Sequence, residues 1–327
     1  MALIIHHLRF TARAATPLEL DAQGGAAIRG ALTNALWERF CANKAAPTCA
    51  DCPLVRICPV AFLVAPLRED DQKGGDQRPR PYTVRPPLDK ARSYAPGDPL
   101  AFELTLIGQA AQLFPYVVLA AQALEEHGLG RRLPELRGRR GRLEVLEIAA
   151  VNPLTDAHQS LYERGKRTVQ APGLPITPDD VRAYAAALPC DRITLVFRTP
   201  LRLIDDQQLV KRITLRPLIQ RLMRRLDDLA IAYGDGPLGI DFRALLDQAA
   251  QVQTIDDCTR WVDVVSFSSR QRRSTPIGGL VGSATFAGDL TNLRELLVWG
   301  SLIHVGKNAV KGDGWYQIVG RPTSDER

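Results

Sequence analysis

A loop near the carboxyl end of the sequence holds the residue types that best suit acid–base and phosphate chemistry. It follows a predicted helix and contains one histidine, two lysines and three glycines: His304, Gly306, Lys307, Lys311, Gly312 and Gly314. Histidine transfers protons readily because its pKa lies near neutrality. Ammonium groups attract phosphate, and glycines let backbone amides approach an anion. The loop therefore predicts a phosphate-binding site, with a plain glycine-rich turn between a helix and a strand as the alternative.

Two arginine-rich groups extend this basic character. One group precedes a predicted strand, and the other lies on a predicted amphipathic helix; their members are Arg270, Gln271, Arg272 and Arg273, and Arg221, Arg224 and Arg225. With a net charge of +6, they favour a polyanionic partner. The alternative is an ordinary solvated charged face.

Four cysteines fall within eighteen residues: Cys41, Cys49, Cys52 and Cys58. Four thiolates satisfy tetrahedral zinc, and a Cys-x-x-Cys pair is a common half-site. The spacing around Cys58 and Pro59 suits an iron–sulfur cluster equally well. Either would be structural, since four thiolates leave no open position for catalysis. We therefore expect no catalytic metal.

Periodicity places these groups on a repeated pattern of strands and helices. Strands are predicted at 3–14, 82–85, 100–107, 143–152, 161–169, 191–203, 261–267 and 279–286, with a last one ending near 318. Helices are predicted at 27–40, 113–127, 214–233 and from a cap at Asp289 to Ile303. This order suits an α+β protein with two ferredoxin-like (RRM-like) domains in tandem, residues 1–189 and 190–327, with a cysteine-rich insert in the first.

The composition indicates the size class of the protein and its expected cellular compartment. The chain has 327 residues, 45% of them apolar and 24% charged, which is ordinary for a globular protein of two domains. It has no run of 18 apolar residues and no signal-peptide layout. We therefore expect a cytoplasmic protein without a membrane partner, whose cysteines stay reduced or bind metal.

Several ordered pieces of the C-terminal region resemble the CRISPR-associated repeat-RNA-processing endoribonucleases of the RAMP superfamily. The matching pieces are Arg270-Gln271, Gly278-Gly279-Leu280-Val281-Gly282, Ile303-His304-Val305-Gly306-Lys307 and the later glycines Gly312 and Gly314. The sequence Gly-Ala-Ala-Ile-Arg-Gly-Ala-Leu at residues 25–32 is similar to that of the first helix in the same branch of the family. Some members of this branch carry a similar cysteine insert. Asp313 departs from the pattern, which usually has an apolar residue there, so its carboxylate is expected to point away from the phosphates.

The resemblance implies an RNA partner, no small-molecule cofactor, and cleavage by the substrate's own 2′-hydroxyl. That reaction needs a base, an acid and cations for the charged transition state. Among five histidines, His304 is best placed and Lys307 follows it. Many relatives take a histidine from near the first helix, but residues 25–65 contain none. His6 or His7 is therefore an alternative base. Two other hypotheses stay open: a non-cleaving RNA-binding subunit of a CRISPR effector complex, and a metal protein in which RNA binding is incidental.

Overall fold

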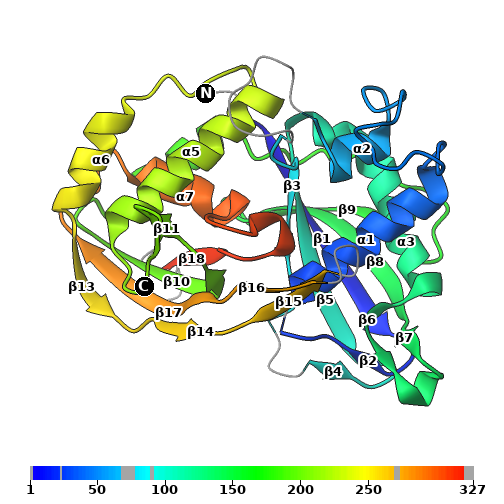
Figure 1. The fold of residues 1–327 in the computed structure, drawn as a ribbon. Coiled ribbons are helices and arrows are strands. Elements are labelled where there is room, and N and C mark those ends of the chain that lie inside the picture. Colours follow the sequence, from blue (N-terminus) through cyan, green and yellow to red (C-terminus); the bar gives the residue numbers. More distant parts are fainter. Residues whose placement is uncertain (1–2, 23, 68–77, 89–91, 269–272, 320–327) are drawn as a thin grey trace. The chain divides into compact units, whose positions relative to one another are not determined.

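The computed structural model describes residues 3–22, 24–67, 78–88, 92–268 and 273–319. The chain divides into two compact units (Figure 1). The N-terminal unit comprises residues 3–176 with 232–234, and the C-terminal unit comprises 177–231 and 235 onward. The division falls after Ile176 rather than near Pro189, because the helix that follows packs within the C-terminal unit. No helix in the described ranges is both long enough and apolar enough to span a bilayer.

The N-terminal unit is a βαββαβ arrangement around one antiparallel sheet. The sheet order is β3-β5-β1-β8-β9, so the four core strands have ferredoxin-like order and β9 adds an edge. The sheet strands are β1 (Ile5–Ala14), β3 (Tyr82–Arg85), β5 (Pro99–Ile107), β8 (Leu143–Asn152) and β9 (Ala157–Glu163). Its α-helices are α1 (Gly24–Phe40), α2 (Pro59–Val64) and α3 (Phe114–His127). The shorter elements are β2 (Leu18–Glu19), β4 (Ser93–Tyr94), η1 (Gly108–Leu113), β6 (Leu129–Leu133), η2 (Pro134–Leu136) and β7 (Arg139–Gly141).

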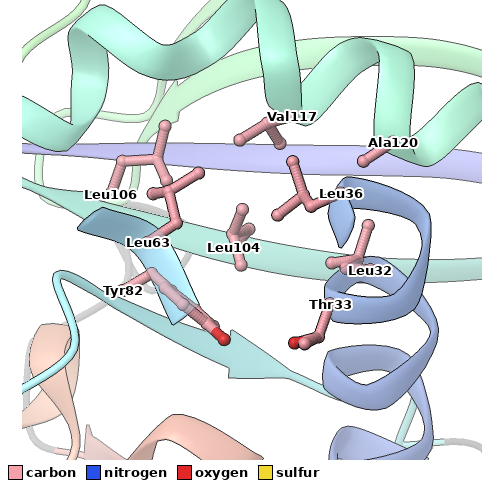
Figure 2. A pocket seen from close by; sticks show the side chains of 9 residues that line it. All are labelled: Leu32, Thr33, Leu36, Leu63, Tyr82, Leu104, Leu106, Val117 and Ala120. Carbon is pink, nitrogen blue, oxygen red and sulfur yellow. The ribbon is translucent and has the colours of Figure 1, made fainter. Parts of the chain in front are cut away.

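Helices α1 and α3 pack together over the sheet and form its apolar core. Phe10 and Phe102, opposite each other on β1 and β5, stack with ring centroids 4.8 Å apart. A cavity of about 20 Å³ remains among apolar side chains of α1, α2, α3, β3 and β5 (Figure 2). Its size and apolar lining suit an imperfectly filled core rather than a ligand site.

The C-terminal unit repeats the arrangement. Its sheet order is β13-β17-β10-β18, again the ferredoxin-like order, with β14 also paired to β17. The strands are β10 (Arg192–Leu201), β13 (Gln253–Asp257), β14 (Arg260–Val262), β17 (Gly279–Ala287) and β18 (Tyr316–Val319). The helices are α4 (Pro178–Ala186), α5 (Leu215–Tyr233), α6 (Phe242–Gln251) and α7 (Arg294–Ile303). Two short hairpins, β11 (Ile204–Asp205) with β12 (Gln208–Leu209) and β15 (Val265–Ser268) with β16 (Arg273–Pro276), and η3 (Ala309–Lys311) complete it.

Several predicted boundaries were wrong. Asp289 accepts a hydrogen bond from the Thr291 amide at 3.0 Å and so closes a turn, whereas α7 begins at Arg294. The strand predicted at 161–169 lies earlier, as β9, because a tight turn containing Asp156 (φ 56°) returns the chain directly after β8. The strand predicted at 261–267 is split into β14 and β15.

Candidate nucleic-acid interface

The predicted phosphate loop begins where α7 ends. His304 terminates the helix with φ 62° and ψ 166°, a conformation that turns the chain sharply. Its side chain is fully buried, and its ring stacks on that of Trp315 with centroids 6.3 Å apart. The predicted proton-transfer role of His304 therefore requires that RNA binding make the ring accessible.

The glycines of the loop allow backbone to pack against backbone. Gly306 has φ 84°, and a Cβ there would lie 2.6 Å from the carbonyl oxygen of Arg202. Gly314 has φ 70°, and a Cβ there would overlap the carbonyl oxygen of Val305. The need for glycine at both positions thus follows from packing inside the unit.

Four amides of the loop already donate to backbone carbonyls. They belong to Lys307, Lys311, Gly312 and Gly314, and their donor–acceptor distances are 2.7–3.1 Å. A phosphate at this loop would therefore be bound by side-chain cations rather than by these four amides. Asp313 is only 3% exposed, so its carboxylate is removed from the solvent where RNA would lie.

Arg225 of α5 holds the end of α7 in place. Its Nε donates to the carbonyls of Ile303 at 3.0 Å and His304 at 3.1 Å. Burial lowers the pKa of the Arg225 guanidinium to about 10, while the charge of Asp228 opposes that shift. The side chain stays charged at neutral pH and binds carbonyls that α7 leaves without helical partners.

The neighbouring arginines of α5 differ in their surroundings. Arg221 donates from Nε to the carbonyl of Ile204 at 2.7 Å and is half-buried, whereas Arg224 is exposed. Of the three arginines predicted to contact RNA, Arg224 is therefore the one whose side chain faces solvent. Arg221 and Arg225 are engaged with backbone carbonyls.

A partly exposed cationic and aromatic surface adjoins the loop, with Lys211 and Lys307 exposed and Arg202 and Trp261 half-buried. Lys307 is exposed, and its amide donates to the carbonyl of Arg202 at 3.0 Å. The Arg202 guanidinium lies 5.9 Å from the ring centroid of Trp261, and Lys211 Nζ lies 3.3 Å from the same centroid. Arg202 also donates to the carbonyl of Gly278 at 3.0 Å, which fixes its direction. We call Lys307, Arg202, Trp261 and Lys211 the Trp261 surface.

Sequence reasoning missed three members of the Trp261 surface. Arg202 and Lys211 stand singly in the sequence, and Trp261 follows an acidic stretch. The one sequence feature that could have indicated this surface is a tryptophan, Trp261, which lies in the chain between Lys211 and the arginine-rich group at 270–273. Arg270, Gln271 and Arg272 lie outside the described residues, and Arg273 begins β16.

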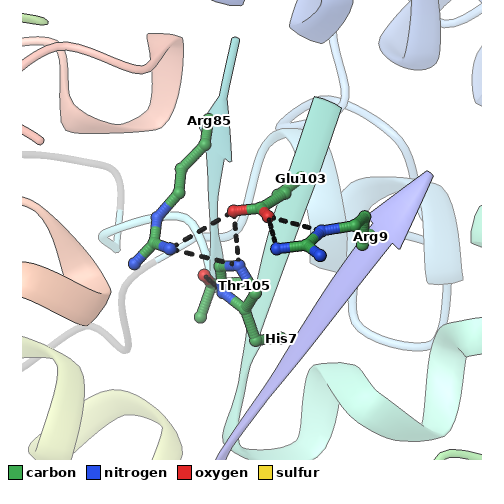
Figure 3. A network of polar contacts seen from close by, with 5 residues as sticks. All are labelled: His7, Arg9, Arg85, Glu103 and Thr105. Carbon is green, nitrogen blue, oxygen red and sulfur yellow. Dashed lines mark hydrogen bonds and ion pairs between the residues drawn. The ribbon is translucent and has the colours of Figure 1, made fainter. Parts of the chain in front are cut away.

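His7, the alternative catalytic residue, belongs to a polar network on the N-terminal sheet (Figure 3). Its Nε2 lies 2.8 Å from Glu103 Oε2, and its Nδ1 lies 2.9 Å from Thr105 Oγ1. Arg85 and Arg9 donate to the same Glu103 carboxylate, at 3.2 and 2.9 Å. Both ring nitrogens of His7 are thus engaged, and the residue is 1% exposed.

The network lowers the pKa of both His7 and Glu103, which favours neutral His7 and ionised Glu103. Burial lowers the pKa of His7, and the charge of Arg85 adds to that effect. Burial alone would raise the pKa of Glu103, but its hydrogen bond with His7, the charge of Arg85 and the hydrogen bond from Arg9 hold that pKa well below its usual range. The stable arrangement is an ionised Glu103 beside a neutral His7. His6 is half-buried, and burial lowers its pKa.

The four clustered cysteines are half-buried and form no disulfide with one another. Cys58 Sγ accepts a hydrogen bond from the Ala61 amide at 3.5 Å and caps α2, and Asn43 Nδ2 lies 3.6 Å from Cys52 Sγ. Within the described residues, which include all four cysteines, no three His, Cys, Asp or Glu side chains are placed to hold a metal ion. As they stand, the thiols do not form a four-thiolate site, and metal binding stays a prediction.

Two family models match the chain. Residues 3–174, just over half of it, match a model described as AF_1859_N, N-terminal domain, and residues 195–316 match CRISPR-associated endoribonuclease Cas6. The chain contains a Cas6-family domain over residues 195–316. The family resemblance seen in the C-terminal motifs is therefore confirmed. The Trp261 surface and the glycine loop lie within the Cas6-matched segment.

Solved structures share the Cas6 fold at low sequence identity. A partial Cas6-RT-Cas1–Cas2 complex matches with TM-score 0.60 and 13% identity, over 97% of this chain and 46% of that one. A Cas6 product complex matches with TM-score 0.57 and 14% identity, over 98% and 100%. A Thermus thermophilus Cas6 matches with TM-score 0.54 and 13% identity, over 98% of this chain and 100% of that one. The tandem ferredoxin-like fold is thus confirmed, while the chain spans under half of the first of these proteins. No curated protein sequence matches.

Proposed function

We propose that this chain binds CRISPR repeat RNA and cleaves it within the precursor transcript to give mature guide RNAs. The reaction would use the substrate's 2′-hydroxyl as the nucleophile, need no catalytic metal and leave a cyclic phosphate. The observation that carries the proposal is the Trp261 surface within the segment matched by the Cas6 endoribonuclease model.

The chemistry of this surface suits single-stranded RNA. Aromatic rings stack on bases of any sequence, and lysine and arginine side chains beside the ring bind phosphates. Lys307, whose amide donates to the carbonyl of Arg202 directly after β10, extends the cations toward the glycine loop. A phosphate bound by Lys307 would place a developing negative charge beside a cation, which stabilises the transition state.

Cleavage in the presence of EDTA tests the reaction. A labelled CRISPR repeat transcript is incubated with the chain in EDTA, and the upstream product is tested for a 2′,3′-cyclic phosphate. Cutting with that end group supports the proposal. A requirement for added Mg²⁺, or a 3′-hydroxyl on the upstream product, overturns the mechanism.

A matched pair of tryptophan variants tests the surface. Trp261→Ala should weaken RNA binding by about 1–3 kcal/mol, the usual contribution of one stacked base. Trp37→Ala is the control, since Trp37 is 43% exposed and also has a lysine, Lys44, near its ring. Equal affinity of the two variants would remove Trp261 from the interface.

The alternative is a non-cleaving RNA-binding subunit of a CRISPR effector complex. The burial of both His304 and His7 favours it, because neither ring is exposed for proton transfer. The same assay separates the two functions. Tight binding of repeat RNA without any cut product would establish the alternative.

A further inference from the structure

The N-terminal unit has a basic feature of its own, built from residues that the proposed function does not use. The β6–β7 hairpin and the end of α3 enclose an open hollow of about 470 Å³. Four arginines line it, together with four other residues: Arg132, Arg139, Arg140 and Arg142, and Thr16, Glu126, His127 and Leu136. We call this the arginine hollow.

The hairpin sets its arginines against one another. Arg132 and Arg140 are directly opposite in the β6–β7 register. Like charges at such a pair are destabilising. Burial lowers the pKa of Arg140, and the charge of Arg132 lowers it further, while the charge of Asp21 opposes both effects only in part. A further anion near the two cations would offset their remaining repulsion.

The described protein supplies little negative charge to the hollow. None of its four arginines forms an ion pair with a carboxylate among the described residues. The acidic lining residue Glu126 instead pairs with Arg39 at 3.7 Å, and the lining His127 lies 3.3 Å from Glu38. Exposed arginines elsewhere in the unit, such as Arg13 and Arg164, do have carboxylate partners at 2.7 Å.

The hollow is a fixed shape rather than a loose group of side chains. The Arg142 amide donates to Thr16 Oγ1 at 2.9 Å, and Arg132 donates to the carbonyl of Gly138 at 3.0 Å. Gly130 has φ 82° and lies directly against the carbonyl of Glu19, so the hairpin is held close to the neighbouring segment. The backbone that carries these arginines and the Arg132 guanidinium are therefore held in place before any ligand arrives.

We propose that the arginine hollow binds the phosphate backbone of RNA, as a second contact outside the Cas6-matched segment. The inference rests on the proposed function, because it takes the RNA substrate as the polyanion. Guanidinium groups match phosphate geometry and bind it without reading sequence. The hollow would therefore add affinity and salt dependence and leave the choice of repeat to other contacts.

A charge-matched comparison tests the hollow. Arg139→Gln with Arg142→Gln changes two arginines of the hollow and keeps Arg132 and Arg140, whose side chains brace the hairpin through backbone carbonyls. The control is Arg13→Gln with Arg182→Gln, which removes the same charge from two exposed arginines that pair with carboxylates. Binding of poly(U) is measured against salt concentration for both variants and the wild type.

The hollow variant should bind more weakly and reduce the log–log salt slope by about 1–2 units, while the control keeps the wild-type slope. Equal slopes in the two variants overturn the inference. If the double variant does not fold, Arg139→Gln and Arg142→Gln are measured singly against Arg13→Gln, with about half that change expected. Cleavage of repeat RNA by the wild type is scored separately, so wild-type cleavage with equal slopes refutes the hollow alone. A wild type that neither binds poly(U) nor cuts repeat RNA refutes both proposals.

Discussion

Arg225 on α5 donates from Nε to the backbone carbonyl of His304 on the loop after α7, 3.1 Å away. A second hydrogen bond from the same nitrogen reaches Ile303 at 3.0 Å. The arginine thus fixes the backbone at the residue predicted to act in catalysis. Its role in the site is to position this residue, and RNA need not touch it.

We predict that Arg225→Met destabilises the chain by about 1–3 kcal/mol. Methionine keeps an unbranched apolar side chain but leaves buried carbonyls without their charged donor. Arg224→Met is the matched control, because the adjacent arginine is exposed. Urea unfolding followed by circular dichroism measures both variants. Equal stability of the two would contradict the positioning role.

The second prediction concerns the cut itself. If His304 transfers a proton, His304→Phe should slow single-turnover cleavage by about 10²–10⁴-fold, since phenylalanine has no titratable group. Phenylalanine retains an aromatic ring to stack on Trp315, so the fold and RNA affinity should be kept. Lys307→Ala should lower both affinity and rate, because it removes a cation that binds phosphate and stabilises the transition state.

Two controls make this comparison decisive. His6→Gln combined with His7→Gln should cut at a near-normal rate if His304 is the catalytic residue. A fast His304→Phe beside an inactive double variant would move the site to β1. A fast His304→Phe beside an active double variant would leave His304 with a purely structural role.

Local patterns were enough to predict most sheet strands and the longer helices of both units, but not β13. Alternating apolar residues identify β10 and β17, and apolar residues at helical spacing identify α5. Three helices were missed, namely α2, α4 and α6. The caps of α4 and α6 were visible in the sequence. Thr177 and Asp180 form a capping box before α4, and Asp241 caps α6. Prolines near Thr177 and the short length of both helices obscured the periodicity.

The site was harder to predict because it depends on residues far apart in the sequence. Gly306 needs to be glycine because of the Arg202 carbonyl, which the sequence places about a hundred positions earlier. The same separation hid the proximity of Arg202 to Trp261. Arg225 could have been distinguished from Arg224, since it lies three residues from Leu222 and four from Leu229 on the apolar side of α5.

The third prediction concerns the arginine group before β17. Replacing Arg270, Arg272 and Arg273 together with alanine should weaken RNA binding. The log–log salt slope should fall by about one unit for each phosphate that these arginines neutralise in the wild type. Filter binding across a salt series measures the slope. A variant with the wild-type slope would show that these arginines are solvated and do not bind phosphate.

The fourth prediction follows from the charge states of His7 and Glu103. Below the ordinary histidine pKa of about 6.5, the unfolded chain binds a proton that folded, neutral His7 does not. Stability should therefore fall as the pH drops from about 6.5 toward the lowered pKa of His7. Glu103 affects the free energy of unfolding at lower pH. Its stabilising contribution is present above the unfolded glutamate pKa of about 4.3 and is lost as the pH falls toward its depressed folded value.

Melting temperatures measured across this pH range test the network. His7→Gln should lose the part of the acid dependence that lies just below the ordinary histidine pKa of about 6.5, since glutamine does not titrate. His158→Gln removes an exposed histidine of the same unit and is the matched control. If His7→Gln and the wild type show the same pH profile, folded His7 does not differ from unfolded histidine.

The last prediction concerns Cys41, Cys49, Cys52 and Cys58. Their spacing predicts that protein prepared without oxygen carries one zinc ion or one iron–sulfur cluster per chain, which elemental analysis counts. A visible absorption band would separate the brown cluster from colourless zinc thiolates. Binding requires residues 41–58 to rearrange, because the thiols do not form a ligand set as placed.

Metal bound only in the folded state adds its binding free energy to folding, so Cys49→Ser with Cys52→Ser should lower the melting temperature. Cys190→Ser with Cys258→Ser, which changes two exposed cysteines of the other unit, should not. Protein without stoichiometric metal would contradict the prediction and leave Cys58 with the capping role seen at α2.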